Sequence, residues 1–147
     1  MSTHVELQDA VVKALNTAAL EFSIEAVAAD EAYYDLENIT DSLKVNVVRG
    51  GRTHTPASRA NDQSDYLLHV GVMKRWEGLT NDELRCKFDE CDAFIEQLWK
   101  YLRRLRLGAD GGAMPVAFEV VAPYSVDHRE RLRQFTAEFI ITLRRIE

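Results

Sequence analysis

The chain has little of what marks several specialised classes of protein. Its 147 residues include only two cysteines, which excludes the disulfide framework of small secreted domains. Lysine and arginine (18) are outnumbered by aspartate and glutamate (24), and the resulting charge of −6 argues against a dedicated nucleic-acid-binding protein. No apolar run approaches the roughly 20 residues that span a bilayer. The length instead predicts one globular domain over residues 1–147.

The first residues and the cysteines bear on where the protein is made. The start of the chain lacks a basic region followed by an apolar run, so no signal peptide is expected. Cys86 and Cys91 lie five residues apart on a predicted helix, which rotates them by about 140° from each other and prevents their pairing within it. An exposed free thiol is typical of a reducing compartment, so we expect synthesis in a cytosol.

The acidic charge is concentrated in the first half of the chain. Residues 1–73 hold 5 basic and 11 acidic side chains, whereas residues 74–147 hold 13 of each. The stretch 30–41 is especially acidic, and Tyr33, Tyr34 and Leu36 are embedded in it. Acidic surfaces are usually just solvated, and that interpretation is favoured for this one.

Residues 65–108 are the best organised part of the sequence. Tyr66, Leu68, Val70 and Val72 alternate with other residues, which predicts a strand. A capping box then begins at Thr80, and a helix follows that ends before Gly108. Its apolar stripe comprises Leu84, Phe88, Cys91, Ile95, Leu98, Leu102 and Leu105. We expect this stripe to pack across a sheet rather than in a coiled coil.

The other elements complete an α+β fold. A capping-box pattern at Thr3 predicts a first amphipathic helix up to Ala18. The strands are predicted over residues 22–29, 43–47, 65–73, 116–122 and 135–143. The order α-β-β-β-α-β-β favours a mostly antiparallel sheet of four to five strands, packed by the N-terminal helix and the long central helix. Residues 49–64, between two strands, are polar and contain Gly50-Gly51, so we interpret them as a loop.

No residues with an obvious chemical role stand together in the sequence. His4, His54, His69 and His128 are scattered and lack metal-ligand spacing. Asp127 precedes His128, but adjacent residues seldom face each other, and no nucleophile motif accompanies them. Neither Gly50-Gly51 nor Gly111-Gly112 has phosphate-binding spacing. We therefore predict no catalytic residue, no metal site and no cofactor.

A second, smaller apolar strip lies on the central helix. Phe94 and Tyr101 are seven residues apart and about 90° away from the main stripe by helical geometry. The sheet need not cover such a strip. Such a strip either contacts a partner, when it stays exposed, or is covered by a loop that packs against it.

Three segments of the chain resemble a family of tailed-phage and prophage proteins. They are residues 65–75 (DYLLHVGVMKR), 101–108 (YLRRLRLG) and 124–136 (YSVDHRERLRQFT). The family is that of tail terminator, or tail completion, proteins of the lambda minor tail protein U type. The resemblance extends in element order over nearly the whole chain.

The resemblance implies a structural virion protein without enzymatic activity. Such a protein forms a ring, commonly a hexamer, on the last ring of tail-tube subunits, stops tube growth and offers a surface for the head. The implied partners are other copies of the chain, the tail-tube protein and a head-completion or neck protein. No membrane and no specific nucleic-acid sequence is involved, although DNA passes through such a ring. The implied location is the tail-neck region of the virion, after assembly in the host cytoplasm.

A ring requires head-to-tail contacts between two different patches of each subunit. We take six residues from the apolar strip, the polar loop and the end of the central helix as candidates for contacts with another subunit or the tube: Phe94, Tyr101, Arg49, Arg52, Arg59 and Arg104. Two other classes of function stay open. One is another neck component, such as a head-closure or head–tail connector protein. The other is a small ligand-binding module or enzyme whose site the sequence hides.

Overall fold

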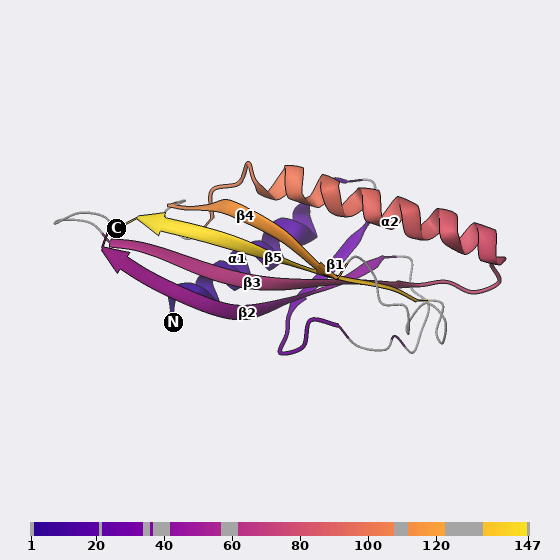
Figure 1. Cartoon of the computed structure of the whole chain (residues 1–147), viewed down its shortest axis with the longest axis horizontal. Helices are drawn as coiled ribbons and strands as arrows, with labels where there is room; N and C mark the ends of the chain where they lie inside the picture. The colour runs from indigo at the N-terminus through magenta and orange to yellow at the C-terminus, as the bar shows by residue number, and fades with distance from the viewer. Residues whose placement is uncertain are drawn as a thin grey trace.

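The structure is a computed structural model that describes residues 2–20, 22–33, 36, 42–56, 62–107, 112–122 and 134–146. Within these ranges the chain forms two helices and five strands (Figure 1). In order they are α1 (Thr3–Thr17), β1 (Ile24–Ala28), β2 (Leu43–Pro56), β3 (Asp62–Arg75), α2 (Asn81–Leu102), β4 (Ala113–Ala122) and β5 (Gln134–Ile146). This element order confirms the predicted α+β class.

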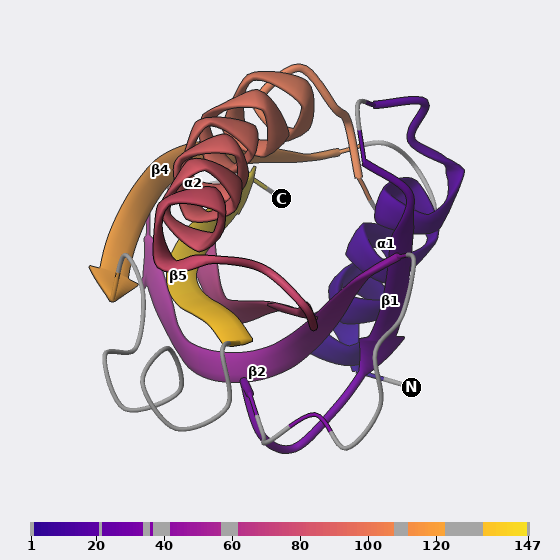
Figure 2. The ribbon, with the colours of Figure 1, turned by 90° about the vertical axis from the view of Figure 1, so that its right-hand side faces the viewer.

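The five strands form one sheet in the order β1-β2-β3-β5-β4. The pair of β1 and β2 is parallel, and the other three pairs are antiparallel, as predicted for the sheet as a whole. β3 is the middle strand of the sheet, and it pairs with β5 from Gln63 opposite Ile146 to Arg75 opposite Gln134. Figure 2 shows that the sheet is strongly curved and that both helices lie on its concave side.

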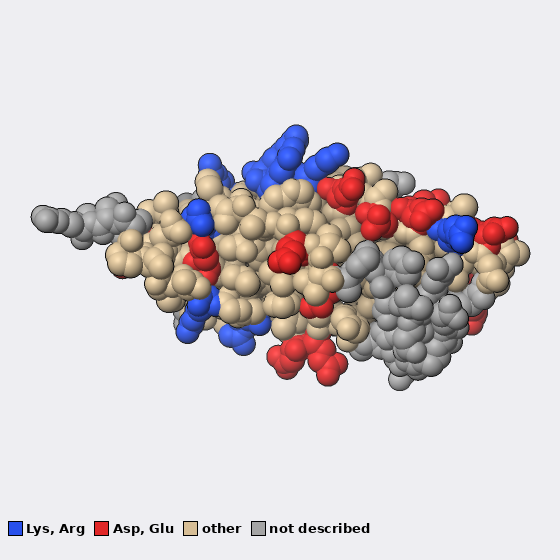
Figure 3. Space-filling view, viewed as in Figure 1, with Lys and Arg blue, Asp and Glu red and all other residues tan. Residues whose placement is uncertain are grey.

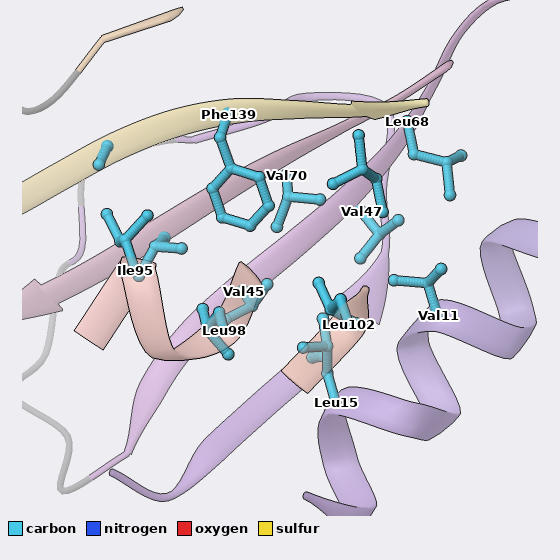
Figure 4. Close-up of a cluster of buried hydrophobic side chains, with 14 of the residues drawn as sticks. Val11, Leu15, Val45, Val47, Leu68, Val70, Ile95, Leu98, Leu102 and Phe139 are labelled. Atoms are coloured by element: carbon cyan, nitrogen blue, oxygen red, sulfur yellow. The ribbon is translucent and has the colours of Figure 1, made fainter. Parts of the chain in front are cut away.

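The core fills the space between the concave side of the sheet and the two helices. Alternate residues of each central strand point into it, because side chains of a strand alternate between its two faces. Figure 4 shows side chains of α1, α2, β2, β3 and β5 meeting there. Six of the seven residues of the predicted stripe on α2 are buried, and Leu105 packs partly buried against the cluster. The helix therefore packs across the sheet, as expected.

The capping of both helices follows local sequence. The Thr80 hydroxyl accepts from the Glu83 backbone N–H (3.2 Å), and the Thr80 N–H donates to the Glu83 carboxylate (3.4 Å), so the predicted capping box is present. α1 begins one residue earlier than predicted, because the Ser2 hydroxyl caps it by accepting from Val5 N–H. α2 ends at Leu102 rather than just before Gly108, which lies outside the described residues.

The predicted loop over residues 49–64 is wrong, since most of it is strand. β2 continues to Pro56 and β3 already starts at Asp62, so the two form a long hairpin. All residues from Gly51 to Pro56 are exposed on both faces, and an all-polar strand lacks the apolar alternation that would reveal it. Residues 57–61 are outside the described part of the chain.

The glycine pair marks a bulge in this hairpin instead of a loop. Arg49 pairs with Leu68 and Arg52 with Tyr66, so Gly50 and Gly51 together stand opposite Leu67. His4 of α1 donates its Nε2–H to the Leu67 carbonyl oxygen (2.9 Å). This hydrogen bond links the hairpin to the first helix at the position opposite the bulge.

In the ranges that the structure describes, neither helix has the length and apolar character to cross a bilayer.

Candidate assembly surfaces

Phe94 does not lie on an exposed strip, which corrects the expectation from helical geometry. Its side chain is fully buried and meets the Phe22 ring edge-on, with ring centroids 4.9 Å apart. Phe22 belongs to the connection between α1 and β1, which covers this side of α2. Of the two possibilities for the strip, shielding by a connecting segment therefore holds at Phe94.

Tyr101 instead lines an open groove of about 550 Å³ at the C-terminal end of α2. Its ring is partly buried against the core, and its hydroxyl donates to the Ala14 carbonyl of α1 (3.3 Å). This bond fixes the ring as part of the groove floor. The described residues that line it are Leu20, Gln97, Lys100, Tyr101, Arg104 and Leu105.

Two cations, Lys100 and Arg104, line this groove, and Arg103 and Arg106 lie next to them in the sequence. Residues 97–107 contain no acidic side chain and four basic ones, and all four are exposed: Lys100, Arg103, Arg104 and Arg106. They stand at the negative end of the helix dipole, where positive charge is favoured. Figure 3 shows Lys and Arg side chains gathered above this part of α2, while Asp and Glu side chains follow the rest of the helix. We call the lining residues and these cations the basic groove.

An acidic surface with exposed apolar groups follows β1. Val27 is 49% exposed and Tyr33 is 42% exposed, and the side chains of Asp30 and Glu31 between them are exposed too. A shallow hollow of about 420 Å³ lies beside them, between β1 and Asn46 of β2. We call Val27, Asp30, Glu31 and Tyr33 the acidic patch. In the sequence, the sign of such a patch was Tyr33 within the acidic stretch, and the interpretation of that stretch as a solvated surface was favoured.

The backbone of the acidic patch is held against the sheet. Asn46 donates its Nδ2–H to the Glu31 carbonyl (3.0 Å), and Ala29 N–H donates to the Val47 carbonyl (3.0 Å). Ala32 passes directly over Gly71 of β3, where a Cβ atom would lie 1.6 Å from the Ala32 carbonyl oxygen. These contacts fix the backbone and leave the two carboxylates at the surface.

The structure divides the predicted arginines between two regions. Arg104 lines the groove with Tyr101, whereas Arg49 and Arg52 are exposed on the β2–β3 hairpin. Figure 1 shows the far end of this hairpin at one end of the long axis, apart from α2. Arg59 lies outside the described residues. The six candidates therefore do not form one surface.

The outer strand β4 is poorly suited to accept another strand. Pro115 lacks a backbone N–H, and the register shifts twice, between Pro115 and Ala117 and between Val120 and Ala122. Proline and bulges are features that block edge-to-edge pairing of sheets. Contacts between copies of this chain are therefore expected to use side chains, not strand addition at β4.

Two polar pairs cross the convex face of the sheet. Arg144 donates to both carboxylate oxygens of Asp65 (2.9 and 3.3 Å), and this hydrogen bond, with the attraction of the two charges, raises the pKa of Arg144. His69 Nδ1 lies 3.0 Å from a carboxylate oxygen of Glu138. His69 thus lies on a sheet face, as predicted, and lines neither of the two hollows. No three potential metal ligands cluster within the described ranges.

The two cysteines give a first testable prediction. Cys86 is exposed and Cys91 is buried, and burial raises the pKa of the Cys91 thiol from 9.0 to about 12. A buried neutral thiol is a poor nucleophile, so the native chain should react with one equivalent of a thiol reagent at pH 8. In denaturant both thiols should react, as counted by absorbance or mass spectrometry. Rapid reaction of two thiols in the native chain would contradict the packing of α2.

No protein-family model and no curated protein matches this sequence. A functional assignment therefore depends on the residues themselves.

Proposed function

We propose that this chain is a structural virion protein that forms a ring on the end of a phage tail tube, ends its polymerisation and presents a surface for head attachment. The resemblance of residues 65–75, 101–108 and 124–136 to tail terminator proteins carries the proposal. The first of these segments falls in β3, and the second spans the end of α2 and the connection after it. The third lies largely outside the described residues.

The surfaces of the chain are consistent with this proposal. A closed ring of identical subunits needs two different patches on each copy. The basic groove at the end of α2 and the acidic patch after β1 differ in charge and belong to different elements. Both combine charged groups with apolar ones, as the surfaces of specific protein interfaces do.

The test is the growth of tail tubes in the presence of the chain. Purified tail-tube protein would be polymerised with and without this chain, and tube lengths measured by negative-stain imaging. We expect shorter tubes whose ends carry added density. Tubes that grow to the same length with bare ends would contradict the proposal. Binding to a head-completion protein but not to tubes would assign the chain to another neck position.

A further inference from the structure

We infer that the basic groove of one copy of this chain receives the acidic patch of a second copy. The inference rests on the proposed function, because it specifies the contact by which a ring of subunits closes. The occupant is the segment from Val27 to Tyr33 of the neighbouring subunit, with Tyr33 directed to the apolar floor and Asp30 and Glu31 to the cations.

The positions of the two surfaces suit a head-to-tail contact. Figures 1 and 2 show the C-terminal end of α2 at the top of the molecule and the segment after β1 at the bottom, in both views. In Figure 3, a group of Lys and Arg side chains at the top and a group of Asp and Glu side chains at the bottom both lie near the middle of the long axis. A contact between opposite sides at one level adds little displacement along that axis. A head-to-tail contact forms a closed ring only when the rotation between neighbouring copies closes and no displacement accumulates along the ring axis, so this arrangement is compatible with a ring.

The chemistry of the two surfaces is complementary. The groove floor contains Leu20, Tyr101 and Leu105, and its volume of about 550 Å³ has room for an aromatic side chain. Tyr33 is exposed on the other surface. Tyrosine is enriched at the centres of interfaces because it adds apolar area and a polar group at small entropic cost. Lys100 and Arg104 of the groove then face the carboxylates of Asp30 and Glu31.

Both surfaces are already in place before they meet. The Tyr101 hydroxyl is fixed to Ala14, and the Glu31 carbonyl is fixed to Asn46. A rigid patch loses less conformational entropy on binding than a mobile one. Another acidic surface that could bind the basic groove of a second copy is the exposed side of α2 near Asp89 and Asp92, which is held in a regular helix. That surface lacks an exposed aromatic side chain, so the patch after β1 fits the groove better.

Reciprocal charge reversal tests the contact in the full-length chain. Arg104→Glu and Glu31→Arg would be made singly and together, and assembly followed by light scattering over a range of concentrations. Each single change places like charges together, so each should raise the concentration of half-assembly about tenfold or more. The double variant restores opposite charges and should recover most of this loss. Arg85→Glu and Asp89→Lys, exposed changes elsewhere on α2, serve as matched controls and should assemble as the unmodified chain does.

The fold of each variant would be checked by circular dichroism and thermal unfolding. Unchanged assembly of Arg104→Glu would overturn this contact. A double variant that assembles no better than either single variant would overturn it too. Neither result would contradict the proposed ring. Loss of assembly with Asp89→Lys but not with Glu31→Arg would also overturn it and assign the groove to the acidic side of α2. An unmodified chain that stays monomeric, alone and with tail-tube protein, would instead overturn the proposed function.

Discussion

Leu98→Asp is expected to unfold the chain. Leu98 is fully buried on α2 and points into the core between the two helices and the sheet (Figure 4). The substitution removes a well-packed side chain and buries an unpaired carboxylate, a change that costs about 4 kcal/mol or more. Domains of this size are stable by only about 5–15 kcal/mol, so this cost removes most of the stability of a domain at the lower end of that range. Far-ultraviolet circular dichroism and urea unfolding measure the effect.

Ala93→Asp is the matched control for this substitution. Ala93 lies on the same helix but is exposed, so the new charge stays in water. Its cost is limited to the lower helix propensity of aspartate and the repulsion from Asp89, Glu90 and Glu96, three or four residues away, together about 2 kcal/mol or less. A folded Leu98→Asp chain with a stability like that of Ala93→Asp would show that the stripe of α2 is not the core.

Gly71→Ala has the second largest expected effect. A Cβ atom at Gly71 would stand 1.6 Å from the oxygen and 2.4 Å from the carbon of the Ala32 carbonyl. The obstacle is backbone, which cannot rotate away like a flexible side chain, so the segment that carries the acidic patch has to move. Overpacking of this kind costs about 1–3 kcal/mol. We expect a lower midpoint of thermal unfolding and, because the patch is displaced, weaker assembly.

Gly51→Ala provides the comparison, since a Cβ atom there meets nothing within 4 Å. Both changes add one methyl group to a glycine of the same sheet, in β2 and in β3. Equal unfolding midpoints for the two variants would contradict the close approach of Ala32 to Gly71.

The sequence predicted the elements whose signals are local. The stripe of α2 and its capping box depend on residues three or four positions apart, and both are present in the structure. The strands β3 and β5 show apolar alternation because one face of each is buried. The distal part of β2 has no buried face, so it carries no such pattern, and its register depends on pairing with β3.

The surfaces were only partly predictable because they join distant segments. Helical geometry placed Phe94 on a separate strip, whereas its side chain is buried in the core cluster, because Phe22, 72 residues earlier, covers it and nothing local shows this. Tyr101 and Arg104 were identified from one predicted helix. Their groove is completed by Leu20, which follows α1 and is distant in the sequence. The contact of Ala32 with Gly71 likewise arises only when the segment after β1 folds over the sheet.

The most direct test of the central claim, assembly into a closed ring, is the mass of the chain in solution. Light scattering would be recorded over increasing concentrations, alone and on purified tail-tube protein. We expect a fixed multiple of the 16.8 kDa chain, with six copies implied by the resemblance, that stops growing as concentration rises. A mass of one chain under both conditions, or a mass that rises without limit, would contradict the claim.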